Sequence, residues 1–129
     1  MNRNVIVTGS GQGIGYAIAQ AFDQQGDRVF IFDMSKDAAE AAAQSLEKGV
    51  AYQVDVTDET TVKNAIKDVT NQYGAIDVLV NNAGIQYISK IEGFPLDKWN
   101  QVIGVIQTGT FLMTKHVLPS MKPVSYTQL

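Results

Sequence analysis

The 129-residue sequence contains no cysteine, one histidine and three prolines. Without cysteine the chain can form neither a disulfide framework nor a thiolate metal site, which favours a cytosolic protein. The single histidine, His116, has no carboxylate or second histidine at a metal-ligand spacing, so we expect no metal site. No apolar run approaches the roughly 20 residues that a membrane-spanning helix requires, and the N-terminus lacks a secretory signal pattern. We therefore expect a soluble, cytoplasmic protein with no membrane partner.

Positive charge is also scarce. The chain has 10 Lys and Arg residues against 13 Asp and Glu residues, which gives a formal net charge of −3. The basic residues are scattered and form no stripe that could follow a phosphate backbone, so nucleic acid is excluded as a partner. The length is close to the common domain size of roughly 100 to 150 residues, and one domain or part of one is expected.

Four apolar runs of strand length alternate with three segments of helical periodicity. The runs are rich in Val, Ile, Phe and Tyr, as buried strands are. The predicted strands comprise residues 4–9, 28–33, 50–56 and 76–84. The predicted helices between them comprise residues 13–26, 35–49 and 58–74. This strict alternation favours a parallel sheet with helices on both faces, because each parallel connection needs a crossover that a helix supplies.

The helical segments carry start and stop residues. Gly26, Gly49 and Gly74 each follow a helical pattern and predict its C-terminal end. Ser35 predicts the start of the second helix. Thr57, with acidic residues directly after it, predicts the start of the third.

A longer helix is predicted over residues 97–121. Gly104 and Gly109 weaken it locally but permit close packing against another helix. The tail 123–129 shows no strong period, so we interpret residues 1–122 as one incomplete domain and the tail as atypical. Because a doubly wound sheet usually continues, we expect a chain truncated after about four strands and four helices.

Gly9, Gly13 and Gly15 lie between the first predicted strand and the first predicted helix. Residues without a side chain suit a tight turn, the close approach of a phosphate and close packing of helix on strand. The N-terminus of the helix offers unpaired amides and a positive dipole to a pyrophosphate. Taken alone, these glycines are also compatible with a plain turn between strand and helix.

Asp33 ends the second predicted strand, 18 residues beyond Gly15. A carboxylate at this point accepts hydrogen bonds from both hydroxyls of an adenosine ribose and repels a 2′-phosphate, so it favours NAD over NADP. Taken alone, Asp33 is also compatible with a turn before Ser35. Together, the glycine loop and Asp33 predict a Rossmann-type, doubly wound α/β domain that binds a dinucleotide.

Three segments, TGSGQGIG (8–15), DVTD (55–58) and NNAG (81–84), resemble in order and spacing the signature segments of the short-chain dehydrogenase/reductase family. The resemblance extends from residue 3 to about residue 121 and implies a nicotinamide cofactor. The residues that it assigns to the cofactor phosphates are Gly9, Ser10, Gln12, Gly13, Ile14 and Gly15. It places Asp55 and Val56 beside the adenine. It places Asn82, Ala83 and Gly84 beside the nicotinamide ribose. It also implies that Asn81 ties neighbouring strands together. NNAG alone is equally compatible with a plain turn.

The segment that begins at NNAG is similar to the part of the family that contains 3-hydroxybutyrate dehydrogenases. In those enzymes a glutamine directly after NNAGI helps to hold the substrate carboxylate, and Gln86 corresponds to it; an exposed loop glutamine is the alternative. The resemblance thus implies hydride transfer between NAD and a small hydroxy or keto compound, with a 3-hydroxy acid as one candidate. It also implies a homo-oligomer formed through residues 97–121.

The sequence departs from the family where the chemistry takes place. It contains no Tyr-x-x-x-Lys pair, with which these enzymes move a proton, and no serine in the expected strand before it. Tyr126 follows Ser125 but lies three residues from the end, so we reject it and assign no catalytic residue. Ile106 stands where many members carry an asparagine of a proton relay. We expect the N-terminal half of an enzyme, inactive alone; the alternatives are a dinucleotide-binding fragment and a cofactor-sensing protein.

The remaining candidates are assigned structural roles. Met34, Met113 and Met121 are predicted to fill gaps in the packing, as thioethers commonly do. His116, next to Lys115, is predicted to be solvated rather than catalytic.

Overall fold

The computed structural model describes residues 2–121, so the expectations for the tail 123–129 and for Tyr126 lie outside the described residues. The elements of the first part are β1 (Asn4–Thr8), α1 (Gly13–Gln24), β2 (Arg28–Asp33), α2 (Lys36–Gln44), β3 (Gly49–Gln53) and α3 (Glu59–Tyr73). Those that follow are β4 (Val78–Val80), the 3-10 helix η1 (Ile91–Gly93), α4 (Leu96–Ile103), the π-helix η2 (Gly104–Thr108), α5 (Gly109–Val117) and the 3-10 helix η3 (Leu118–Ser120).

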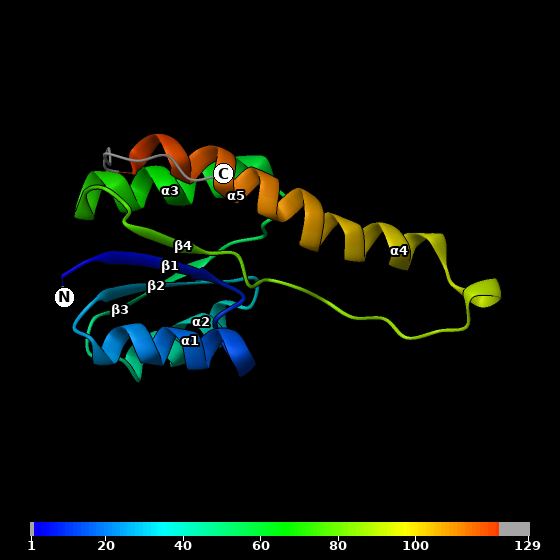
Figure 1. Cartoon of the computed structure of the whole chain (residues 1–129), viewed down its shortest axis with the longest axis horizontal. Coiled ribbons are helices and arrows are strands. Elements are labelled where there is room, and N and C mark those ends of the chain that lie inside the picture. Colours follow the sequence, from blue (N-terminus) through cyan, green and yellow to red (C-terminus); the bar gives the residue numbers. More distant parts are fainter. Residues whose placement is uncertain (1, 122–129) are drawn as a thin grey trace.

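The four strands form one parallel sheet in the order β3-β2-β1-β4. Val5 of β1 lies opposite Val29 of β2 on one side and Val78 of β4 on the other. Helices α1 and α2 cover one face of the sheet, and α3 and α5 cover the other (Figure 1). This is the predicted Rossmann-type, doubly wound arrangement. The strand order reverses between β1 and β4, and such sheets bind their ligands at the carboxyl ends of the strands beside that point.

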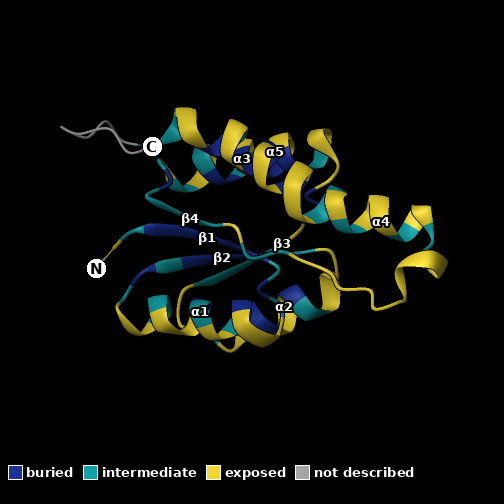
Figure 2. Ribbon diagram, turned by 45° about the vertical axis from the view of Figure 1, so that its right-hand side comes forward, coloured by how far each residue is buried: buried dark blue, intermediate teal, exposed yellow. Residues whose placement is uncertain are grey.

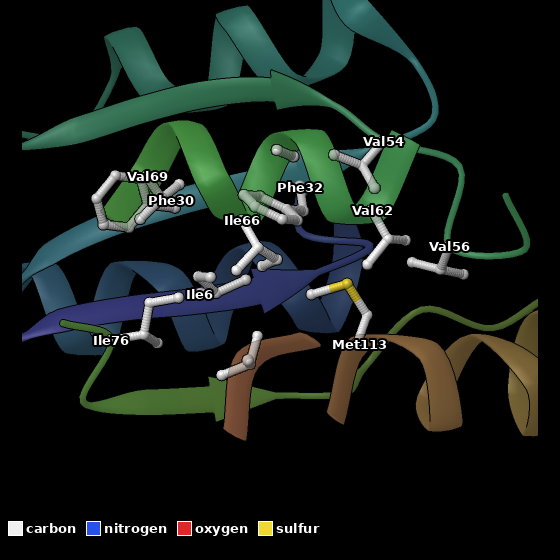
Figure 3. Packing of buried hydrophobic residues seen from close by; sticks show 12 residues of the cluster. Ile6, Phe30, Phe32, Val54, Val56, Val62, Ile66, Val69, Ile76 and Met113 are labelled. Carbon is white, nitrogen blue, oxygen red and sulfur yellow. The ribbon is translucent and has the colours of Figure 1, made fainter. Parts of the chain in front are cut away.

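Side chains of the two central strands alternate between two apolar layers. The layer toward α1 and α2 consists of Val5, Val7, Ala19, Val29, Ile31, Ala39, Ala42 and Ala43. On the opposite face, Ile6, Phe30 and Phe32 pack against α3 and α5 (Figure 3). Because both faces of these strands are covered, their sequences are continuous apolar runs, which is why the strands could be recognised.

The methionines differ in depth. Met113 of α5 is fully buried in the layer formed by α3 and α5, as the sequence predicts (Figure 3). Met121 is partly buried against the same layer. The prediction that Met34 fills a packing gap is wrong, because this residue follows β2 directly and is 58% exposed.

Two predicted helix boundaries are also wrong. The third helix is capped by Asp58, whose Oδ1 accepts from the amides of Thr60 and Thr61 at 3.0 and 3.3 Å, and not by Thr57. The second helix ends at Gln44, well before Gly49, which instead begins β3. A side chain at Gly49 would collide with the backbone of Ala43, so close packing of β3 on α2 requires this glycine. Ser35 caps α2 as predicted, accepting from the amide of Ala38 at 3.2 Å.

The predicted strands 50–56 and 76–84 are shorter in the structure. β3 ends at Gln53. The residues after it form a turn in which the side chain of Asp55 accepts a hydrogen bond from the amide of Thr57. β4 ends at Val80, because the amide of Asn82 already bonds back to the Val80 carbonyl at 3.1 Å. Both carboxyl ends therefore open into loops at the same edge of the sheet.

The long helix predicted over residues 97–121 contains a π-turn. α4, η2 and α5 follow one another without a break, and α4 extends beyond the sheet (Figure 1). Much of the surface of α4 is exposed (Figure 2). At its other end this helix packs closely on the loop after β3, because a Cβ on Gly109 of α5 would lie 3.0 Å from Cβ of Val56. Within residues 2–121, no helix is long and apolar enough to cross a membrane.

An ionic cluster joins α3 to α5. Glu59 Oε2 lies 2.7 Å from Lys115 Nζ and 2.8 Å from His116 Nε2. The hydrogen bond from Lys115, followed by the one to His116, lowers the pKa of Glu59 to about 2. The His116 side chain is 18% exposed, so the prediction that it is simply solvated is wrong.

Candidate functional site

The loop between β1 and α1 is fixed by close contacts within the protein. Gly9 has a φ of 64°, and a Cβ there would lie 2.8 Å from Cα of Ala83 in the loop after β4. A Cβ on Gly15 would lie 2.5 Å from Nδ2 of Asn82 and would also collide with the Gly9 carbonyl. Any side chain at these two positions would separate the loops after β1 and β4. Both glycines are therefore explained by the packing of the chain on itself.

Gly13 has a different environment. Its φ is 63°, but a Cβ added there would meet no protein atom within 4 Å. It begins α1 and lines a cavity of about 490 Å³. The N-cap residue Gln12 makes no side-chain hydrogen bond to the helix, whereas Ser35 and Asp58 cap α2 and α3. The first amides of α1 and the positive end of its dipole therefore lie at the cavity without a side-chain cap.

The cavity lies at the carboxyl ends of the strands and contains most of the residues predicted from the sequence. The predicted residues that line it are Gly9, Gln12, Gly13, Ile14, Gly15, Asp33, Val56, Asn82, Ala83 and Gly84. The lining residues that sequence reasoning missed are Phe32, Met34, Val54, Ile85 and Val105. Phe32 and Val54 adjoin predicted site residues at strand ends, which was a usable signal. Val105 comes from the distant π-helix, and nothing in its local sequence indicates a role here.

Asp33 is held in place by two backbone amides. Its Oδ2 accepts from the amide of Gly11 and its Oδ1 from the amide of Ser35, both at 2.9 Å. One such bond on each oxygen leaves further lone pairs for hydroxyl donors. Among the described residues that line the cavity, Asp33 carries the sole charged side chain. This region can therefore accept hydrogen bonds from a ligand.

The loops after β1 and β4 are joined through Thr8 and Asn82. Thr8 Oγ1 accepts from the amides of Asn82 and Ala83 at 3.0 and 2.9 Å, and Asn82 Nδ2 donates to the carbonyls of Thr8 and Gly9 at 3.2 Å. The strand tie is thus Asn82, and its assignment to Asn81 is corrected, since Asn81 Nδ2 donates to Thr114 Oγ1 of α5 at 3.3 Å. Sequence reasoning missed Thr8, although a polar residue at the end of an apolar strand was a signal.

Three predicted site residues do not line this cavity. Ser10 is fully buried, and its Oγ donates to the Val7 carbonyl at 2.7 Å. Asp55 lines a neighbouring cavity of about 670 Å³, where its Oδ1 accepts from the amide and hydroxyl of Thr57 at 2.9 and 2.6 Å. Gln86 is exposed in the loop after β4 and lines neither cavity. The structure brings the other predicted residues together without these three.

Two further observations concern the chemistry of the site. Ile106 of η2 lies beside the loop after β4, with Cγ1 3.9 Å from the position of a Cβ on Gly84. The position that the family resemblance links to a proton relay is therefore a hydrocarbon side chain next to Gly84, and it lines neither cavity. In the part of the chain that the structure describes, no three His, Cys, Asp or Glu side chains gather where they could hold a metal ion.

Comparisons with known proteins agree with this geometry. The family model described as short chain dehydrogenase matches residues 3–128. The chain is 41% identical over 128 residues to the uncharacterized oxidoreductase YxjF of Bacillus subtilis, covering 96% of this chain and 50% of that protein. It is 33% identical over 124 residues to the D-beta-hydroxybutyrate dehydrogenase of Cupriavidus necator, covering 93% and 48%.

A solved structure has the same fold. The crystal structure of 3-ketoacyl-(acyl-carrier-protein) reductase from Brucella melitensis, complexed with NADH, superposes with a TM-score of 0.88 at 31% identity. The match covers 92% of this chain and 50% of that one. The chain thus spans about half the length of the proteins that it matches.

Proposed function

Because the chain belongs to the short chain dehydrogenase family, we propose that it binds NAD in the cavity at the carboxyl ends of its strands. The observation that carries this proposal is Gly13, where a helix N-terminus without a side-chain cap borders the cavity and no protein atom fills the space beside Cα. A phosphate needs such space and such amides. Bound NAD would supply hydride transfer between its nicotinamide ring and a carbonyl or alcohol carbon.

The residues around the cavity fit the remaining parts of the dinucleotide. The amides of Gly13, Ile14 and Gly15 would hold the pyrophosphate, and the free lone pairs of Asp33 would accept from the adenosine ribose hydroxyls. Asp55 and Val56 would flank the adenine. The residues that would line the nicotinamide ribose are Asn82, Ala83 and Gly84. In this proposal Ser10 supports the loop through its bond to the Val7 carbonyl and acts on the phosphates only indirectly.

The preference for NAD over NADP rests on Asp33. A 2′-phosphate placed beside its carboxylate would be repelled, and the described cavity lining offers no cation in compensation. Calorimetric titration of the chain with both dinucleotides tests the assignment. We expect NAD to bind at least roughly tenfold more tightly, and tighter binding of NADP would contradict the proposal.

For a protein of the length of the relatives, we propose hydride transfer between NAD and a small hydroxy or keto compound. Gln86 would donate its amide to a substrate carboxylate without adding a second full charge, which makes a 3-hydroxy acid one candidate. The similarity to a D-beta-hydroxybutyrate dehydrogenase supports this substrate class. The printed sequence contains no Tyr-x-x-x-Lys pair, so the proton that accompanies the hydride would be moved by groups outside these 129 residues.

The absence of that pair from the sequence also favours a second function for the 129 residues alone. In this alternative the chain binds or senses the dinucleotide without turning it over. An assay that measures NADH formation from NAD by its absorbance, with a panel of small alcohols and 3-hydroxy acids as substrates, distinguishes turnover from binding alone. Turnover by the purified 129-residue chain would rule out the binding-only function.

We also propose that the partner of the long helix is a second copy of the chain. The exposed apolar side chains along it include Trp99, Ile103, Ile106, Phe111 and Leu118. The steps of four and three residues between the first three are those of a helix-pairing seam. η2 supplies the additional residue in the step from Ile106 to Phe111, which keeps the seam on one side of the helix.

A further inference from the structure

Met34 stands at the boundary between the two cavities. It follows Asp33 directly, lines both cavities and is 58% exposed. Its carbonyl accepts from Nε2 of Gln53 at 3.2 Å, which ties this position to the end of β3. Within residues 2–121 the other methionines differ from it, because Met113 is fully buried and Met121 is partly buried in the core.

An exposed thioether reacts with peroxides. A sulfur lone pair attacks one peroxide oxygen, the O–O bond breaks and an S–O bond forms. The departing hydroxide takes the proton from the transferred oxygen and leaves as water, so the sulfur loses two electrons to become the sulfoxide and hydrogen peroxide is reduced. Methionine sulfoxide reductases reverse this change, so the modification can serve as a switch.

We propose that Met34 is an oxidation-sensitive residue of the dinucleotide site, where peroxide reversibly weakens NAD binding; this inference rests on the proposed function. In the reduced state the thioether offers an apolar, polarisable surface next to the ribose acceptor Asp33, suited to the face of a nucleobase. The sulfoxide would place a strongly polar oxygen on that surface. Covering this oxygen with a base removes its water without supplying a donor, and this weakens binding.

The same contact predicts a reciprocal effect. If the sulfoxide form binds NAD more weakly, NAD stabilises the thioether form by the same factor, a reciprocity that concerns the equilibrium between the two forms. Bound NAD would also cover the sulfur directly. Met121, which lies in the core layer and lines neither cavity, should oxidise at the same rate with and without NAD.

The experiment treats the chain with hydrogen peroxide, follows each methionine by peptide mass spectrometry and titrates treated and untreated protein with NAD by calorimetry. Met34 should oxidise at least roughly tenfold faster than the buried Met113, and saturating NAD should slow it. Oxidation should weaken NAD binding roughly tenfold, and methionine sulfoxide reductase should restore it. In Met34→Leu, peroxide should leave the affinity of that variant unchanged, whereas Met121→Leu should respond as the parent chain does.

The outcomes separate the two proposals. An untreated chain that does not bind NAD overturns both the proposed function and this inference. NAD binding that persists at full strength after complete oxidation of Met34 overturns this inference alone. Oxidation of Met34 no faster than that of Met113, or an equal loss of affinity in peroxide-treated Met34→Leu, also overturns it.

Discussion

The carboxylate of Asp33, at the end of β2, accepts a hydrogen bond from the backbone amide of Gly11 at 2.9 Å. Gly11 belongs to the loop that leads into α1, so the proposed ribose acceptor also holds the proposed phosphate loop in position. A Cβ on Gly11 would lie 2.7 Å from Asp33 Oδ2, which explains why a glycine stands there. The two parts of the candidate site are thus mechanically connected.

Replacing Asp33 should affect both affinity and cofactor choice. Asp33→Ala removes the ribose acceptor and the Gly11 anchor, and we expect NAD binding to weaken roughly tenfold or more, as for the loss of a charge-assisted hydrogen bond. Asp33→Asn is the matched control, because it keeps one acceptor oxygen for Gly11 but loses the charge. Calorimetry with NAD and NADP should show that both variants reduce the preference for NAD. An unchanged ratio of the two affinities would refute the role given to Asp33.

Substitutions of Gly13 and Gly15 should affect NAD binding and stability to different extents. Gly15→Ala introduces a Cβ against Asn82 and the Gly9 carbonyl, and should destabilise the fold by about 1 to 3 kcal/mol through overpacking. Gly13→Ala meets no protein atom and should cost about 1 to 2 kcal/mol for its positive φ, while placing a methyl group where a phosphate would lie. Urea unfolding and NAD titration of both variants measure the two effects. If Gly13→Ala bound NAD as the parent chain does, the phosphate assignment would be wrong.

The sequence predicted most of the framework because the responsible forces are local or periodic. Central strands covered on both faces give continuous apolar runs, and helices that pack on a sheet repeat their apolar residues at helical spacing. The glycines of the loop and Asp33 were recognisable because their requirement is set by backbone geometry at strand ends. Membership of the short chain dehydrogenase family was predicted from three short segments and is confirmed by the match over residues 3–128.

Features that depend on contacts between distant residues were not predictable. The contact between His116 and Glu59 could not be predicted, because the two residues lie 57 positions apart in the sequence. His116 was therefore expected to be solvated. Likewise, the contribution of Val105 to the cavity depends on where the π-helix crosses the sheet edge. The start of the third helix was missed for a local reason: Thr57 and Asp58 are both good capping residues, and Asp55, two positions before Thr57, accepts from the amide and hydroxyl of Thr57.

The cluster around Glu59 should make stability depend on pH in the acid range. Its pKa is lowered from 4.5 to about 2 in the folded chain, so its contribution is present above 4.5 and is lost as the pH falls toward 2. Urea unfolding at several pH values should show that the stability difference between the parent chain and Glu59→Gln shrinks as the pH falls below 4.5. Lys115→Met, which removes the first donor, should reduce this pH-dependent part. A difference that is independent of pH would contradict the account.

Charge on the helix seam should prevent self-association. Ile103→Glu and Phe111→Glu each place a carboxylate among exposed apolar side chains, and burying it between two copies should weaken association roughly tenfold or more. Gln101→Glu adds the same charge on the side of α4 that lines the second cavity, so it serves as the control. Sedimentation equilibrium measures the association constant. A parent chain that stays monomeric, or equal effects of all three variants, would exclude the seam as the interface.

The mapping of NAD onto the chain by amide chemical shifts in NMR spectra shows directly whether the dinucleotide binds at the carboxyl ends of the strands. We expect NAD at saturating concentration to shift the amides of Gly13, Ile14 and Gly15 most strongly, together with those next to Asp33. AMP should reproduce the changes near Asp33 and leave those at the nicotinamide end around Gly84 small. Shifts confined to other surfaces, or no shifts at all, would contradict the claim that α1 and β2 form a dinucleotide site.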